Sequence, residues 1–419
     1  MLHPWRRFVP DLPAHLLDQA RRLDAEDPLA SYRDAFVLPD GVLAYLDGNS
    51  LGRPLVRTRD RVGSFVAEEW GARLIRSWDE RWMEHPLVLG DQLGRVVLGA
   101  APGQTVVADS TTVMLYKLLR AAVDASPGRT EVVADTENFP TDRYIVDAIA
   151  AERGLTVRWI EPDPAAGVTV EEVRAAVSSS TAVVLLSHVA YKSAYVADLP
   201  AITAAVHEAG ALVLWDLCHS AGAVELALDA DGVDLAVGCS YKYLNGGPGA
   251  PAFGYVAERL QGRLVQPIAG WMGHAEPFAM GGAYEPAAGM RRFISGTPPI
   301  VGMLPLQDML DLVEKAGMPA IRAKSVLLTD FTIRVAEELL APHGVTVASP
   351  RDPECRGSHV LLEHDAMRDV VAGLWERGVI PDFRHPRGLR AGLSPLSTSF
   401  GEVLLALGHV RELLTEIST

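Results

Sequence analysis

Cysteine is scarce in this sequence, and no cysteine stands in a metal-binding pattern. The 419 residues include 3 cysteines, Cys218, Cys239 and Cys355. An odd and sparse set excludes a disulfide framework and is typical of a reducing compartment, so we expect a cytoplasmic protein. No CxxC or Cys/His pair has the spacing of metal ligands, and we expect no bound metal. A chain of this length can bury a large core without disulfides or a structural metal.

Positive charge and long apolar runs are also lacking. The sequence has 38 Lys and Arg residues against 53 Asp and Glu residues, a formal net charge of −15. Nucleic acids and anionic membrane surfaces are bound by clustered basic residues, so this composition argues against both partners. No apolar run reaches the roughly 18 residues of a membrane helix, and the N-terminus lacks the apolar core of a signal peptide. A small anionic ligand stays compatible with this charge, because a few local donors can hold it.

Short apolar strands alternate with helical stretches in the middle of the chain. Strands are expected at 105–109, 131–136, 155–160, 182–187, 211–216, 233–240 and 252–257, and helices at 110–125, 168–177 and 199–210. This alternation predicts an α/β fold with a mostly parallel central sheet. Ligands of such sheets bind at the carboxyl ends of the strands, so the residues that follow each strand are the candidates for function.

The chain divides into three expected parts. Residues 1–45 are predicted to form an N-terminal arm, residues 46–300 a large α/β domain, and residues 301–419 a smaller α+β domain. The Gly- and Pro-rich stretch 258–300 is typical of a long functional loop.

An acid and an amine follow two of the expected strands. One strand ends at Asp216, and another runs directly into Lys242 and a glycine-rich loop. If both strands lie in the central sheet, the two side chains meet at one edge. An amine in such a place is a candidate Schiff-base former, because burial and nearby positive charge lower the pKa of such amines. A buried carboxylate would keep a pyridine nitrogen protonated, as pyridoxal 5′-phosphate (PLP) requires.

The same sheet edge offers candidates for the phosphate and the ring of PLP. Thr111 and Thr112 open a predicted helix after Ser110, where free N–H groups favour a dianion, although hydroxyls at such a place most often only cap the helix. Phe139 follows another strand and could stack on the ring, although a core aromatic is the commoner reading. His219, three residues after Asp216, would by itself more often be a satisfied buried histidine.

Seven segments together carry a more specific signal. They are LDGNSLGRP (46–54), FPTDRY (139–144), WDLCHSAGAVEL (215–226), CSYKYLNGGPGAPAF (239–253), GWMGH (270–274), SGTPP (295–299) and RGVIPDFRHPRGLRAGLSPL (377–396). In combination they resemble the kynureninase family of PLP enzymes, which has the aspartate-aminotransferase fold, fold type I. The resemblance covers nearly the whole chain, and its most specific part is the pairing of WDLxHxxGxVEL with SYKYLNGG.

The resemblance implies a set of cofactor contacts. PLP would be bound covalently to Lys242, with Asp216 at the pyridine nitrogen and His219 near the ring. The other implied contacts are Thr111, Thr112 and Tyr241 at the phosphate, Phe139, Pro140, Thr141 and Asp142 around the ring, Ser187, and Trp271 and Thr297 from a neighbouring subunit. The active unit would therefore be a homodimer with shared sites, and Lys242, Tyr241 and Asp216 would be the catalytic residues.

The reaction that the resemblance implies is hydrolysis of L-kynurenine to anthranilate and L-alanine, in the kynurenine pathway of tryptophan catabolism. Arg390 would bind the substrate α-carboxylate, and Asn49, Ser50 and Trp70 are further substrate candidates. Family members that prefer 3-hydroxykynurenine carry a His in the segment matching 68–78 and an Asn at position 297. This chain has Trp70 and Thr297 there, which resembles the bacterial, kynurenine-preferring type.

Four other functions are compatible with parts of the sequence. Gly48–Gly52 matches the G-x-S-x-G elbow of serine hydrolases, although too few residues precede it for the strands that the elbow should follow. A cysteine desulfurase would use a mobile nucleophilic cysteine, for which Cys355 is the candidate, and an aminotransferase would share the fold. A non-enzymatic binding module would not need Lys242 at all.

Overall fold

The seven expected strands form one sheet in the computed structural model, which describes residues 11–418. Its order is β2-β8-β7-β6-β5-β3-β4, and only β8 runs antiparallel to its neighbours. The strands are β2 (Thr105–Val107), β3 (Glu131–Asp135), β4 (Thr156–Ile160), β5 (Thr181–Ser187), β6 (Leu212–Asp216), β7 (Leu235–Cys239) and β8 (Ala252–Val256). The predicted α/β fold with a mostly parallel sheet is confirmed.

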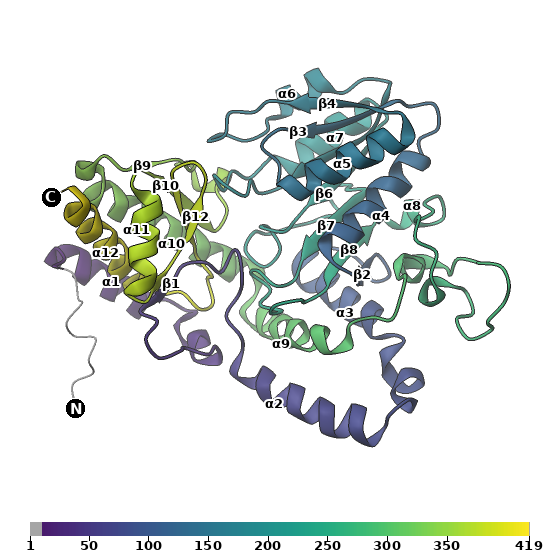
Figure 1. The fold of residues 1–419 in the computed structure, drawn as a ribbon, viewed down its shortest axis with the longest axis horizontal. Coiled ribbons are helices and arrows are strands. Elements are labelled where there is room, and N and C mark those ends of the chain that lie inside the picture. Colours follow the sequence, from purple (N-terminus) through teal and green to yellow (C-terminus); the bar gives the residue numbers. More distant parts are fainter. Residues whose placement is uncertain (1–10, 419) are drawn as a thin grey trace.

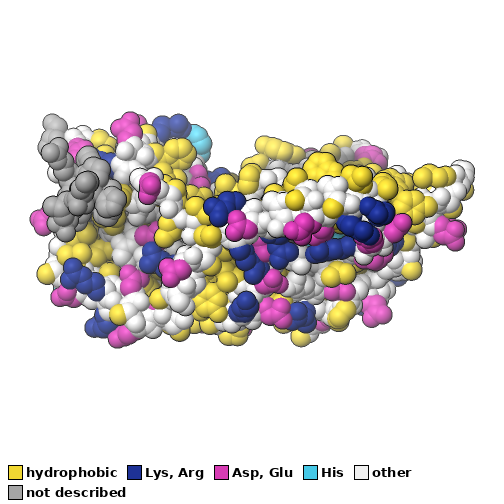
Figure 2. Space-filling view, turned by 90° about the horizontal axis from the view of Figure 1, so that it is seen from below, with side chains coloured by type: hydrophobic (Ala, Val, Ile, Leu, Met, Phe, Trp, Pro, Cys, Tyr) yellow, Lys and Arg dark blue, Asp and Glu magenta, His cyan; other side chains and the backbone are white. Residues whose placement is uncertain are grey.

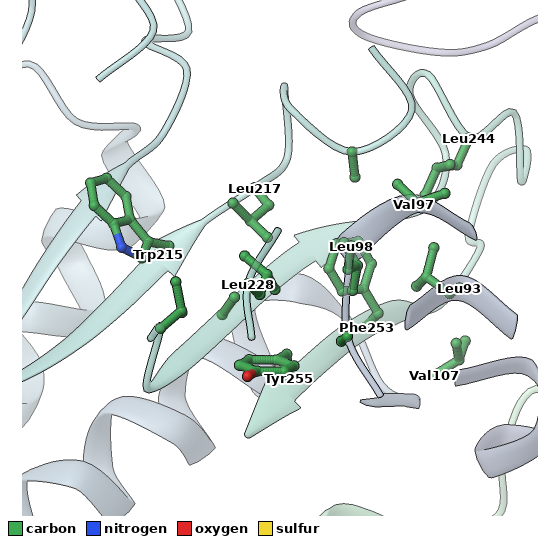
Figure 3. Close-up of a cluster of buried hydrophobic side chains, with 14 of the residues drawn as sticks. Leu93, Val97, Leu98, Val107, Trp215, Leu217, Leu228, Leu244, Phe253 and Tyr255 are labelled. Atoms are coloured by element: carbon green, nitrogen blue, oxygen red, sulfur yellow. The ribbon is translucent and has the colours of Figure 1, made fainter. Parts of the chain in front are cut away.

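Both faces of this sheet are buried, as the apolar runs of the sequence require. Alternate residues of β5 belong to different apolar clusters: Val183 and Leu185 pack with the helix α4 (Thr111–Asp124), and Val184 and Leu186 pack on the opposite side. Figure 3 shows that second cluster, where Trp215 from β6 and Phe253 and Tyr255 from β8 lie among leucine and valine side chains. The predicted helix start at Ser110 is also found, since its hydroxyl accepts a hydrogen bond from the Val113 N–H at 3.4 Å.

Further helices surround the sheet. Those that follow or connect its strands are α5 (Pro140–Arg153), α6 (Val170–Ala176), α7 (Leu199–Glu208) and α8 (Glu258–Gln261); those from the neighbouring parts of the chain are α2 (Val56–Ser64), α3 (His85–Leu93) and α9 (Ile300–Ala316). Figure 1 shows α9 running beneath the sheet toward the second body of the molecule. Among residues 11–418, no helix is long and apolar enough to cross a bilayer.

The second body contains the C-terminal part of the chain (Figure 1). Its antiparallel sheet has the order β12-β13-β10-β9, and a second pair joins β1 to β11 in parallel. Its strands are β1 (Ala44–Tyr45), β9 (Thr346–Val347), β10 (His359–Glu363), β11 (Val379–Ile380), β12 (Asp382–Arg384) and β13 (Gly388–Gly392), and its helices are α1 (Ala14–Glu26), α10 (Met318–Leu339), α11 (Met367–Glu376) and α12 (Phe400–Ser418). Leu16 and Ala20 of α1 share one apolar cluster with α10 and α12, so the N-terminal helix packs on this body.

The loop after β1 lies against the segment that carries Lys242. A Cβ atom on Gly52 would lie 2.4 Å from the Lys242 carbonyl oxygen, and one on Gly48 would lie 1.9 Å from Ser394 Oγ. Neither position can accept a side chain without moving its neighbours. The glycines of the 46–54 segment therefore let this loop, which carries Asn49 and Ser50, pack closely against the segments that contain Lys242 and Ser394.

Candidate active site

Lys242 lies at the centre of a cluster of the predicted residues. It follows β7, its side chain is buried, and its Nζ atom lies 3.3 Å from Nε2 of His219. The ring centroid of Phe139 is 5.8 Å from the same Nζ atom, and that of Tyr241 is 5.9 Å away. The amine thus faces a histidine and two aromatic rings at the carboxyl edge of the sheet, where we expected it.

Two buried carboxyl groups lie beside this amine. Asp216 ends β6, and its Oδ1 atom accepts a hydrogen bond from the Cys218 N–H at 2.7 Å. Asp142, in the first turn of α5, is buried, and its Oδ2 atom has no hydrogen-bond partner among the described residues. Burial and the neighbouring Asp216 carboxylate raise the pKa of Asp142 well above its ordinary value. Lys242 is one cation beside these two buried carboxyls, and a protonated pyridine nitrogen would provide a second, so the residues present fit PLP.

Ser187 is tied into the same cluster through a residue that the sequence analysis missed. It lies directly opposite Asp216 in the register of β5 and β6, and its hydroxyl donates to Oδ1 of Asn138 at 2.7 Å. Asn138 is buried, and its Nδ2 atom has no partner among residues 11–418. Its position directly before Phe139 was the available signal. An unpaired buried amide at this edge is a further polar group that a bound cofactor could satisfy.

Asp135 is a second residue that the analysis missed, and it makes stability depend on pH. Burial raises its pKa to about 7. The folded state therefore binds this proton more tightly than the unfolded chain, and the resulting stabilisation is lost as the pH rises toward 7. We expect Asp135→Asn to remove this loss, which amounts to about 2.6 kcal/mol between pH 5 and pH 8. Urea unfolding of both proteins at the two pH values measures it, and an equal change with pH in both would contradict the assignment.

The predicted phosphate-binding site lies at the N-terminus of α4. Ser110 caps the helix, and Thr111 and Thr112 form its first turn, with Thr111 half-buried and Thr112 exposed. Free N–H groups in that turn attract a dianion. This turn is largely open to solvent.

The predicted substrate residues Asn49, Ser50 and Arg390 meet in the structure. Arg390 lies on β13, 1% exposed, and donates to Ser50 Oγ at 2.8 Å and to the Tyr191 carbonyl at 2.7 Å. It also forms an ion pair with Asp382 at 2.8 Å. With the Asn49 amide oriented so that both of its ends are satisfied, its oxygen accepts from Arg390 Nε at 2.9 Å. Burial lowers the pKa of Arg390 to about 10, so the group stays charged at neutral pH.

Three predicted residues lie apart from this cluster within one chain. Trp70, in the helical segment Phe65–Ala72, is 55% exposed. Trp271 is partly exposed and contacts Phe278, and Thr297 is exposed on its loop. Among residues 11–418, none of the three makes the hydrogen bonds or ring contacts that join Lys242 to its neighbours.

The geometry weakens two of the alternatives. The Ser50 hydroxyl contacts Arg390, which has only donors, and the Asp47 carboxyl, and no histidine contacts it among residues 11–418, so the Ser–His pair of a serine hydrolase is not formed there. Burial and nearby carboxylates raise the pKa of Cys355, the opposite of what a nucleophilic thiol needs.

Comparisons with known proteins identify the family and the fold of this chain. A model described as Cys/Met metabolism PLP-dependent enzyme matches residues 104–275, and one described as Kynureninase C-terminal domain matches residues 321–410. The kynureninase of Pseudomonas fluorescens is 44% identical, with 94% of each chain covered, and that of Burkholderia pseudomallei (strain 1106a) is 43% identical, with 95% of each covered. The solved apo structure of a cysteine desulfurase from Thermococcus onnurineus NA1 superposes with a TM-score of 0.78 over 94% of this chain and 98% of that one. At 18% identity, that last likeness concerns the fold alone.

Proposed function

This chain belongs to the kynureninase family, and from that premise we propose how its residues share the reaction around Lys242. It is a PLP-dependent enzyme that hydrolyses L-kynurenine to anthranilate and L-alanine. The observation that carries the assignment of roles is the buried contact of Lys242 with His219, next to the paired carboxyls of Asp142 and Asp216. Bound PLP supplies an electron sink, which makes the substrate α-proton acidic and the Cβ–Cγ bond cleavable.

Each polar group in the cluster has a task in this proposal. Nζ of Lys242 holds the cofactor and takes the proton from the substrate Cα atom, while His219 keeps that amine in place. Asp216, with Asp142 beside it, keeps the positive charge on the ring nitrogen. Burial raises the pKa of Tyr241, so its phenol is protonated at neutral pH and can donate a proton. Arg390 binds the α-carboxylate, which would replace the contacts that Asn49 and Ser50 now make.

The remaining cofactor contacts are assigned around this centre. Phe139, Pro140 and Thr141 would cover the ring, Ser187 would contact it beside Asp216, and Thr111 and Thr112 would hold the phosphate. Residues 46–300 would be the cofactor-binding domain, residues 301–419 the domain that supplies Arg390, and residues 1–45 the arm. The three cysteines are all free, which supports a cytoplasmic location.

We propose that the active unit is a homodimer and that Trp271 and Thr297 complete the neighbouring subunit's site. Both lie away from Lys242 in their own chain, on loops that are open to contact. Figure 2 shows apolar side chains gathered along the upper edge of the large domain in that view. Large exposed apolar residues of this domain include Ile75, Phe278 and Met280, and surfaces of this kind mark interfaces.

Mixing two inactive variants tests the shared site. We expect Trp271→Ala and Lys242→Ala to be impaired alone. After the subunits exchange, a mixed dimer would hold one intact site, and random pairing would restore roughly a quarter of the wild-type activity. If each subunit uses its own Trp271, mixing restores nothing, and the proposal of a shared site is wrong.

One assay with two substrates tests the function and the preference together. The PLP-loaded protein should release fluorescent anthranilate from L-kynurenine, and kcat/KM should be higher for L-kynurenine than for 3-hydroxykynurenine, because position 70 is Trp and position 297 is Thr. A protein that carries PLP but releases no anthranilate would refute the function. A higher kcat/KM for the hydroxylated substrate would refute only the roles of Trp70 and Thr297.

A further inference from the structure

His359 is a buried histidine whose ring nitrogens make no well-formed hydrogen bond among the described residues, and the Lys192 backbone interacts with the ring only weakly. His359 begins β10, and its side chain is 0% exposed. A buried polar group without a partner costs on the order of 1–3 kcal/mol. Such a group needs an explanation, and a bound ligand is one.

The side chain of His219 lies between the His359 ring and the Lys242 amine. The centroid of the His359 ring is 5.5 Å from that of His219, and Nε2 of His219 is 3.3 Å from Nζ of Lys242. His359 therefore belongs to the same buried cluster as the cofactor-binding lysine, on the side formed by the small sheet.

The small sheet places the substrate-binding arginine on the same face as His359. In the pairing of β10 with β13, His359 lies opposite Gly392 and Leu361 lies opposite Arg390. Residues two apart share a face of a strand, so the side chains of His359 and Arg390 project to one side. A Cβ atom on Gly392 would lie 2.4 Å from Asn49 Cγ, so the Asn49 side chain occupies the space that a side chain opposite His359 would fill.

A neutral imidazole suits one end of the substrate. Burial, together with the charges of Arg390 and Lys242, holds the pKa of His359 well below its ordinary value, so the ring is neutral and has one donor and one acceptor. In the proposed arrangement Lys242 and Arg390 serve the amino-acid end of kynurenine. The other end is an aryl ketone with an ortho-amine. Its ketone oxygen accepts a hydrogen bond and its amine donates one, which matches the acceptor and the donor of a neutral imidazole.

We propose that His359 binds this aryl-ketone end, with a ring N–H that donates to the γ-carbonyl oxygen. The proposal rests on the proposed function and adds to it a residue that orients the carbon attacked by water. Because the ring is neutral, its hydrogen bond to the ketone adds recognition of this end of the substrate without placing a third cation beside Lys242 and Arg390.

Ligand binding to PLP-loaded variants separates this role from a structural one. Anthranilate keeps the aryl amine and the former γ-carbon, whereas L-alanine is only the amino-acid end. We expect His359→Leu to weaken anthranilate binding, measured by its fluorescence, about tenfold or more, which is about 1.4 kcal/mol. L-Alanine binding, measured from the cofactor absorbance, should stay unchanged, and His359→Gln, which keeps a donor and an acceptor, should bind anthranilate within about threefold of wild type. His409→Leu, at a buried histidine of α12, is the matched control and should bind both ligands normally.

Each outcome decides the proposal. Anthranilate binding that is unchanged in His359→Leu, or a loss shared equally by L-alanine, overturns it. If His359→Leu does not fold, anthranilate binding is compared between His359→Gln and the shorter His359→Asn. Binding that is retained in His359→Gln and lost in His359→Asn supports the contact. Equal anthranilate binding by the two variants overturns it. A wild-type protein that releases no anthranilate from kynurenine refutes the proposed function instead, so the two failures are distinct.

Discussion

Replacement of Lys242 by alanine is expected to remove covalently held PLP and to lower kcat at least about a thousandfold. The amine has two tasks in the proposal, since it holds the cofactor and moves the α-proton, and no other lysine amine contacts His219 in the part of the chain that the structure describes. Borohydride reduction of the wild-type protein, followed by peptide mapping, should place the cofactor on Lys242. The alanine variant should yield no tagged peptide.

Lys192 provides a matched control for this prediction. It lies at the same side of the sheet, and its amine forms an ion pair with Glu137 at 2.8 Å. Lys192→Ala should keep the tag on Lys242 and most of the activity. A tag on any other lysine, or full activity of Lys242→Ala, would refute the assignment of the cofactor-binding residue.

The second large effect is expected at Asp216. Asp216→Asn should lower kcat by about two to three orders of magnitude while the protein retains some PLP, because a neutral amide cannot hold the charge on the ring nitrogen. The Asn oxygen can still accept the hydrogen bond from the Cys218 N–H, so the local fold should persist. The measurements are kcat per bound PLP and the absorbance spectrum of the cofactor.

Asp142→Asn distinguishes the roles of the two carboxyls. Because burial and Asp216 raise the pKa of Asp142, this residue holds a proton more readily than an ordinary aspartate, and amidation should change its charge less. We therefore expect a smaller loss than for Asp216→Asn. Full activity in Asp216→Asn would remove the pyridinium argument, and a larger loss in Asp142→Asn would assign the charge to that residue instead.

Much of the site could be read from strand ends. The sequence places Asp216 and Lys242 directly after apolar runs, and parallel strands bring their carboxyl ends to one edge, so local pattern was enough to bring these two together. Ser187 also follows an apolar run, but only the family resemblance placed it in the site. The cap at Ser110 was predictable for the same reason, because the N–H groups that it serves lie within the next three residues. Asn138 had only a weak local signal, its place before Phe139.

Contacts between segments that are distant in the chain could not be predicted from local sequence pattern. Nothing in the local pattern pairs Asp142 with Asp216, and nothing joins Ser50 to Arg390, which are far apart in the chain. His359 begins an ordinary apolar strand, and only the β10–β13 register shows that it shares a face with Arg390. These associations depend on how the small body docks against the large one, through loops whose glycines allow close approach.

By itself, the sequence determined the order of strands and helices, the position of the reactive amine at a strand end and the family, because each depends on residues close together in the chain or on several motifs at once. Only the tertiary structure decided which polar groups are buried without partners and which charges face one another. The physical reason is that desolvation and Coulomb interactions depend on distances through space, which packing of the two bodies sets after the local elements have formed.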